Sequence, residues 1–145
     1  MKKVIVVLAA IIFFLLVKSG VESYVSRAPD YPDGPTVNGL DLYTNNLTST
    51  FYTSASMDED SLFSGTSIRF HENGKLLVKA GIENGKLHGP FDSWYDNGQK
   101  QVSILWKNGT HCEFLGAYYP NGDPILGSPQ EIAEIVFGDL ITIQP

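Results

Sequence analysis

The chain has 145 residues, the length of one domain, and its hydrophobic content of 43% is typical of a globular protein rather than a disordered one. Its formal net charge is −6, while residues 65–126 are neutral because six basic and six acidic residues balance there. No nucleic acid partner is expected, since phosphate binding needs a basic surface. The single cysteine, Cys112, excludes an intrachain disulfide and a thiolate metal site.

Residues 1–19 have the pattern of a signal peptide or an N-terminal membrane anchor. Lys2 and Lys3 precede an uninterrupted apolar run of 14 residues that ends at Lys18. As a helix this run covers about 21 Å, less than the ~30 Å hydrocarbon core, which favours a signal peptide over a membrane span. An uncleaved segment would anchor the chain to the membrane. In both cases the remainder is expected on the periplasmic or extracellular side of the cell envelope.

Residues 20–62 are predicted to be a linker with possible extra strands. Three prolines between Ala28 and Pro35 indicate the linker, and residues 47–56 have the composition of a strand. The acidic run Asp58-Glu59-Asp60 is expected to be a solvated loop.

Residues 63–126 contain a pattern of period 24. Within this segment the dipeptide Asn-Gly occurs five times, and successive Asn residues are separated by 11, 13, 11 and 13 positions. Asn-Gly is the strongest short hairpin signal, because a type I′ turn needs positive φ at both central residues. The predicted turns are Asn73-Gly74, Asn84-Gly85, Asn97-Gly98, Asn108-Gly109 and Asn121-Gly122.

The fold class expected is all-β, an antiparallel meander of repeated β-hairpins with about six strands and a short C-terminal helix. If each Asn-Gly is a two-residue turn, the register follows by counting outward from it. The predicted opposite pairs are Phe91 with Ile104, Tyr95 with Lys100, Ile82 with Leu87, and Val78 with Phe91. One face of the sheet then carries Val78, Ile82, Leu87, Phe91, Val102, Ile104 and Trp106.

Residues 127–145 are predicted to form the helix and a tail. Ser128 is the expected N-cap, followed by Pro129 at the first helical position and by Glu131, which completes a capping box. A helix of about two turns would end at Gly138, and residues 141–143 could add a last strand. The apolar side of the helix is predicted to be Ile132, Ile135 and Val136.

Three segments resemble the MORN-variant repeat of bacterial proteins, as found in the YwqK-like family. They are Gly89-Pro90-Phe91, Trp94-Tyr95-Asp96-Asn97-Gly98-Gln99 and Lys107-Asn108-Gly109. The resemblance covers about residues 63 to 126, and it implies a sheet of consecutive antiparallel hairpins. Proteins of this kind are often catalogued as antitoxins, and the wider MORN family is linked to protein assembly and to lipid contact.

No residue pattern predicts catalysis, a cofactor or a metal ion. The histidines His71, His88 and His111 lack the spacing of a metal site and are expected to be ordinary strand residues. His111 and Cys112 are adjacent in a strand, so their side chains point to opposite faces and do not form a catalytic pair. The acidic residues Asp92 and Asp96 could suggest paired carboxylates, but such residues beside turns are usually solvated.

Two classes of function remain. The first is a non-catalytic scaffold that binds an unknown protein partner through its sheet, including the antitoxin-like binding that the resemblance implies. The second is a module that binds an envelope polymer or a membrane surface. The candidate partner-binding residues are Phe70, Trp94 and Tyr118, which are predicted on the face opposite the core with Leu77 and Ile125 beside them. Terminal segments could instead cover this stripe as a second core layer.

The predicted targeting segment can be tested with a C-terminal alkaline phosphatase fusion. Because residues 1–19 should direct export, the fusion should be active only when they are present. Activity is measured in intact cells, and the mass of the mature protein reports whether the segment is cleaved. Equal activity from a chain that starts at Gly20 would contradict export.

Overall fold

The computed structural model describes residues 30–45 and 47–141. The predicted signal or anchor segment at residues 1–19 lies outside the described residues, as do positions 142 and 143 of the predicted last strand. The strands are β1 (Thr36–Asn38), β2 (Tyr43–Asn45), β3 (Thr50–Tyr52), β4 (Gly65–Phe70), β5 (Leu76–Glu83), β6 (Lys86–Trp94), β7 (Lys100–Lys107) and β8 (His111–Ala117). The helices are a 3-10 turn at Glu59–Ser61 and α2 (Pro129–Ile141).

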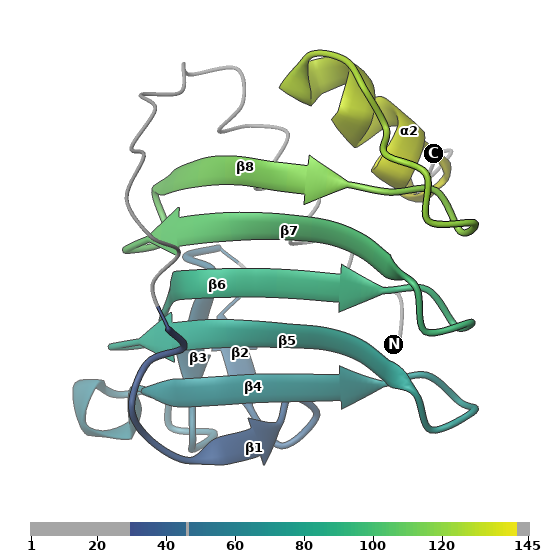
Figure 1. Ribbon diagram of the computed structural model, residues 1–145. Helices are drawn as coiled ribbons and strands as arrows, with labels where there is room; N and C mark the ends of the chain where they lie inside the picture. Colours follow the sequence, from purple (N-terminus) through teal and green to yellow (C-terminus); the bar gives the residue numbers. More distant parts are fainter. Residues whose placement is uncertain (1–29, 46, 142–145) are drawn as a thin grey trace.

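The fold is mostly β, as expected, with one large sheet in the order β1-β4-β5-β6-β7-β8 (Figure 1). Strands β4 to β8 follow one another along the chain, and each runs antiparallel to the next. The sixth strand differs from the expectation. It is β1, which pairs in parallel with β4, whereas the chain after Asn121-Gly122 makes only one bridge, between Tyr118 and Pro124, before it turns toward α2.

The core lies on one face of the sheet, called here the core face. The small hairpin β2–β3 lies behind the large sheet in Figure 1, and α2 lies beside β8. Phe51 and Phe63 from the hairpin region and Ile132, Ala133 and Val136 from α2 all pack into the same apolar cluster. Every residue predicted for the core face is buried there: Val78, Ile82, Leu87, Phe91, Val102, Ile104 and Trp106.

Helix α2 begins with the predicted capping box. The backbone N–H of Ser128 donates to the Glu131 carboxylate at 2.7 Å, and the Glu131 N–H donates to Ser128 Oγ at 3.4 Å. The helix continues through Gly138 to Ile141, so it is longer than predicted and includes the first residue of the predicted last strand. Ala133 is fully buried while Ile135 is 50% exposed, so the apolar side is rotated from the predicted one.

The five Asn-Gly turns are of two kinds, one at each end of the strands (Figure 1). Asn84-Gly85 and Asn108-Gly109 have positive φ at both residues, as a type I′ turn requires. In the other three turns only the glycine has positive φ. At Asn97-Gly98, the Gly98 N–H donates to Tyr95 O and the Tyr95 N–H donates to Gln99 O, both at 2.9 Å. This is a three-residue hairpin loop, and the same bonds recur around Gly74 and Gly122.

The longer loop corrects the predicted register beside Asn97-Gly98. Lys100 is opposite Trp94 instead of Tyr95. One strand position further, a β-bulge at Gln101 adds a residue to β7 and brings Phe91 opposite Ile104, as predicted. Around Asn84-Gly85, Ile82 is opposite Leu87 as predicted, but Phe91 is opposite Ala80 rather than Val78. That shift spans two residues, so it leaves each side chain on its predicted face.

The turn glycines give a testable pair of variants. An added Cβ at Gly74 meets nothing within 4 Å, whereas at Gly85 it comes within 2.6 Å of Leu62 Cδ2 and 2.7 Å of Thr50 Cγ2. Gly74→Ala should therefore lower the free energy of unfolding by about 1–2 kcal/mol, the strain of a left-handed alanine. Gly85→Ala should lower the free energy of unfolding by about 1–3 kcal/mol more than Gly74→Ala does, because the side chains of Leu62 and Thr50 must also move. Equal losses in chemical denaturation would contradict this packing.

Candidate binding face

The three candidate aromatic residues share the outer face, which is the face of the sheet opposite the core. Phe70, Trp94 and Tyr118 each precede a three-residue loop at the same end of the sheet. Their cross-strand neighbours differ from the predicted ones. They are Leu76, Lys100 and Pro124.

Leu77 and Ile125 do not join this face, because of a bulge at Leu77 and because of the three-residue loop before Ile125. Leu77 is the extra residue at the shift between β4 and β5, and it packs against the buried core. Ile125 is 4% exposed and belongs to the core cluster. The extra residue of a bulge and the residue after it point to the same face, so Leu77 points inward with Val78 while Leu76 points outward. The Ile125 N–H donates to Ala117 O, so Ile125 lies on the core face with Ala117. The outer face therefore carries one row across the sheet, the aromatic row: Phe70, Leu76, Trp94, Lys100, Tyr118 and Pro124.

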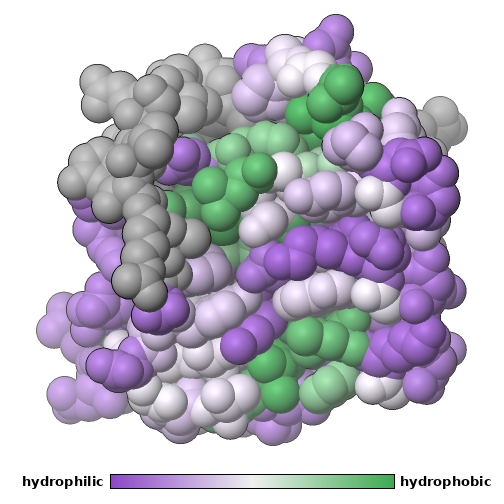
Figure 2. All heavy atoms as spheres, viewed as in Figure 1, coloured by the Kyte–Doolittle hydropathy of each residue, from purple (hydrophilic) through white to green (hydrophobic). Residues whose placement is uncertain are grey.

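The aromatic row is open to solvent at both ends. Phe70 is 49% exposed, Pro124 is exposed, and the four residues between them are half-buried. Helix α2 and the β2–β3 hairpin pack into the core cluster and not onto this row. Figure 2 shows the outer face as a hydrophilic band that crosses the sheet between hydrophobic patches. The row is thus a partly exposed surface.

Side chains of the three-residue loops tie each hairpin to the next. Asn73 Nδ2 donates to Asp96 O at 2.7 Å, and Asn97 Nδ2 donates to Pro120 O at 2.7 Å, one period further on. The backbone carbonyls of Trp94 and Tyr118, two residues of the row, also accept hydrogen bonds from side chains of the preceding hairpin. The His71 imidazole donates from Nε2 to Trp94 O at 2.8 Å, and Tyr95 OH donates to Tyr118 O at 3.0 Å. These bonds hold the backbone beneath the aromatic row in place.

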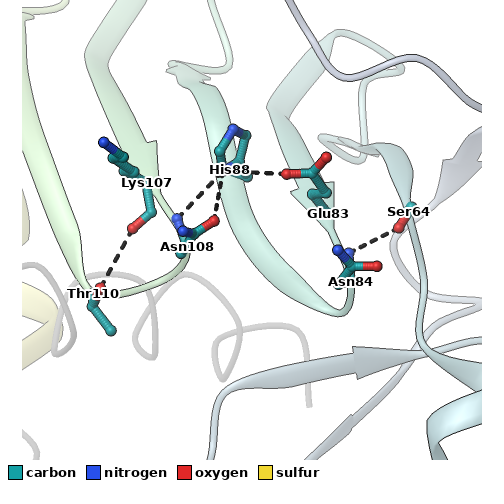
Figure 3. Close-up of polar contacts among 7 residues, drawn as sticks. All are labelled: Ser64, Glu83, Asn84, His88, Lys107, Asn108 and Thr110. Carbon is teal, nitrogen blue, oxygen red and sulfur yellow. Dashed lines mark hydrogen bonds and ion pairs between the residues drawn. The ribbon is translucent and has the colours of Figure 1, made fainter.

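The turns at the other end of the strands are tied by different side chains (Figure 3). Ser64 Oγ accepts from the Asn84 N–H at 2.8 Å. His88 Nδ1 lies 3.0 Å from Asn108 Oδ1 and 3.6 Å from the Glu83 carboxylate. Within residues 30–45 and 47–141 no group of three His, Cys, Asp or Glu side chains could hold a metal ion.

Asp92 is the centre of a polar cluster that the sequence did not indicate. The expected solvated acid is only 8% exposed, while Asp96 is exposed on its turn. The Asp92 carboxylate accepts from Tyr31 OH at 2.6 Å, from Ser103 Oγ at 2.6 Å and from Lys100 Nζ at 2.8 Å. Burial alone would raise the pKa of Asp92, but these three donors outweigh it and lower that pKa below its ordinary value.

Lys100 connects this cluster to the aromatic row. Its Nζ binds Asp92 and also lies 5.4 Å from the centre of the Trp94 ring, within cation–π range. On the other side of the cluster, Lys79 Nζ lies 3.9 Å from the centre of the Tyr31 ring. Burial, with the bond to Asp92, raises the pKa of Tyr31, so its phenol stays a donor.

The segment that contains Tyr31 lies against the outer face. Pro32 approaches the sheet at Gly81 and Gly89, and an added Cβ would come within 2.6 Å and 3.4 Å of its ring carbons respectively. Glycine in a strand interior often marks such a close backbone approach. Glycine at positions 81 and 89 is therefore the sequence feature that indicates the contact between Pro32 and the sheet.

Cys112 has the environment expected for a small hydrophobic residue. It packs against the core cluster, and burial raises the pKa of its thiol to about 11. A thiol with a raised pKa is a poor nucleophile at neutral pH. The side chain of His111 lies outside the described residues.

Comparisons with protein-family models, with curated proteins and with solved structures returned no match. Among the described residues, no helix has both the length and the apolar character needed to cross a bilayer.

The Asp92 cluster predicts a pH dependence of stability. Because the folded chain lowers the pKa of Asp92, the carboxylate contributes stability above its unfolded pKa of about 3.9, and this is lost as pH falls through the folded value. The free energy of unfolding should therefore drop more steeply toward acidic pH in the wild type than in Asp92→Asn. At neutral pH that variant should be less stable by about 2 kcal/mol.

The matched control for this experiment is Asp96→Asn, which changes an exposed acid four residues away. Its denaturation curves should keep the wild-type pH dependence. If Asp92→Asn also keeps it, the carboxylate does not hold the cluster together.

Proposed function

We propose that this chain is a non-catalytic scaffold of hairpin repeats that binds a protein partner through the aromatic row. The repeat unit is the 24-residue period, and the chain is a MORN-variant repeat protein. The proposal is supported by the recurrence of turns, ties and aromatic residues at that spacing, as for Phe70, Trp94 and Tyr118.

The observation that carries the proposal is the aromatic row itself. Successive aromatic residues are two strands apart, which places them roughly 10 Å from one another along the sheet. Aromatic side chains supply large contact areas at interfaces, and they do so best where their backbone is already rigid. The backbone ties from His71 and Tyr95 meet that condition.

A non-catalytic role fits the way in which the reactive side chains are used. The Asp92 carboxylate accepts hydrogen bonds from three donors. The His71 imidazole binds Trp94 O, and the His88 imidazole contacts Asn108 Oδ1. Each of these groups therefore has a structural task in the fold.

The proposed location is the periplasmic or extracellular side of the cell envelope, reached through the signal or anchor pattern of residues 1–19. If that segment remains attached, the scaffold holds its partner close to the membrane surface. A row of aromatic residues could also stack on the sugar rings of an envelope polymer. That second candidate rests on the same residues, and the experiment below separates the two.

The proposal is tested with Trp94→Ala in the full chain. Trp94 is half-buried and lies outside the core cluster, so the variant should lose less than about 1 kcal/mol of unfolding free energy. It should nevertheless lose the protein recovered with the tagged wild type from intact cells. The matched control is Tyr43→Ala, which removes an exposed aromatic side chain from β2, away from the row.

Three other results would oppose the proposal. A loss of about 3–5 kcal/mol would mean that Trp94 belongs to a second core layer. A folded variant that keeps its partner would show that the row is not the binding surface. Loss of co-sedimentation with an envelope polymer, without loss of a protein partner, would favour the polymer.

A further inference from the structure

Residues 30–33, called here the strap, lie against the outer face of the sheet. Tyr31 and Pro32 are half-buried there, whereas Asp30 and Asp33 on either side of them are exposed. Tyr31 precedes a proline, which restricts its backbone to extended conformations. The strap is therefore a short extended segment that contacts the sheet through two neighbouring side chains.

The part of the outer face beneath the strap, called here the strap site, is shaped for these two side chains. Gly81 and Gly89 are buried under Pro32, and a Cβ added there would come within 2.6 Å and 3.4 Å of its ring carbons, respectively. Lys79 Nζ lies 3.9 Å from the centre of the Tyr31 ring, in cation–π contact. The site thus accepts the proline where side chains are missing and holds the tyrosine ring with a cation.

The Asp92 carboxylate adds the most specific contact of the strap site. Its Oδ1 accepts from Lys100 Nζ and Ser103 Oγ, which both belong to the sheet. Among the described residues its Oδ2 accepts only from Tyr31 OH, at 2.6 Å. Asp92 is 8% exposed, and a buried carboxylate oxygen that lacks a donor is penalised. The sheet therefore holds this carboxylate in place and leaves one oxygen for a hydroxyl that comes from outside the sheet.

We propose that the strap site binds a Tyr-Pro segment of a partner protein and that the strap occupies this site as an intramolecular ligand. The contacts described above are made by the tyrosine or the proline, so a Tyr-Pro segment of another chain has the groups to make the same set. Departure of the strap leaves the bonds from Lys100 and Ser103 to Asp92 in place, so the site stays formed. Lys100 also belongs to the aromatic row, but the proposal does not rest on the function proposed for that row.

The attached strap sets the concentration at which a partner can replace it. A segment joined by a short linker competes at an effective concentration on the order of 1 mM. A free segment with the same contacts is therefore expected to bind the wild type weakly. Loss of the Tyr31 side chain removes the competitor from the position that carries the hydroxyl and ring contacts.

The proposal is tested with a dye-labelled peptide that has the sequence of residues 28–35, titrated against the full chain in non-ionic detergent. Binding is followed by fluorescence anisotropy. Tyr31→Ala should bind the peptide at least about tenfold more tightly than the wild type does, because the strap no longer competes. It should bind a peptide that carries Tyr31→Phe at least about tenfold more weakly, because that peptide has no hydroxyl for Asp92. The matched control Tyr43→Ala keeps the strap and should bind like the wild type.

Three results would overturn the proposal. They are the absence of peptide binding to Tyr31→Ala, equal affinities for the two peptides, and a wild-type dimer that Tyr31→Ala abolishes. The dimer, measured by light scattering, would assign the site to the strap of a second copy. If Tyr31→Ala fails to fold, Tyr31→Phe decides, because it keeps the ring beside Lys79 and loses only the hydroxyl. It should bind the tyrosine peptide more tightly than the wild type does, and an unchanged affinity would contradict the site.

Discussion

One extra residue in a return strand decides which side chains lie on the outer face of this sheet close to a three-residue loop. A three-residue loop with a left-handed glycine ends one strand, and a bulge then adds a residue to the return strand. The two irregularities cancel further along, so Phe91 is still opposite Ile104 on the neighbouring strand. Close to the loop they do not cancel, and Lys100 takes the place beside Trp94. The composition of the aromatic row follows from this local shift.

The core face could be predicted because its pattern is robust to these irregularities. Counting outward from Asn84-Gly85 places Phe91 opposite Val78, and the structure places it opposite Ala80, but a two-residue shift leaves the same side chains inside. The capping box at Ser128 was equally predictable, since it depends on contacts within four residues of sequence.

The outer face could not be predicted to the same depth. The bulge decides whether Leu76 or Leu77 faces outward, and no residue in β5 indicates where that bulge lies. The cluster around Asp92 depends on Tyr31, which lies 61 residues earlier in the chain. Contacts of such separation leave no local pattern, and only Gly81 and Gly89 hinted that another segment approaches the sheet.

The outer face thus combines a rigid aromatic row with a buried charged cluster, joined at Lys100. The cluster fixes the Lys100 side chain beside Trp94, so the row presents an ordered cation among its rings. An ordered cation gives a partner surface polar specificity in addition to apolar contact. The lateral ties at Asn73 and Asn97 keep the rings at a constant spacing.

The most direct measurement of this account is site-specific photo-crosslinking in intact cells. A photoreactive phenylalanine analogue is placed in the full chain at Phe70 or Tyr118, and in a control chain at the exposed Tyr43. If the aromatic row is the binding surface, the first two positions give an adduct with the same protein and Tyr43 gives none. Adducts from the control position alone, or no adduct from either position of the row, would contradict the account.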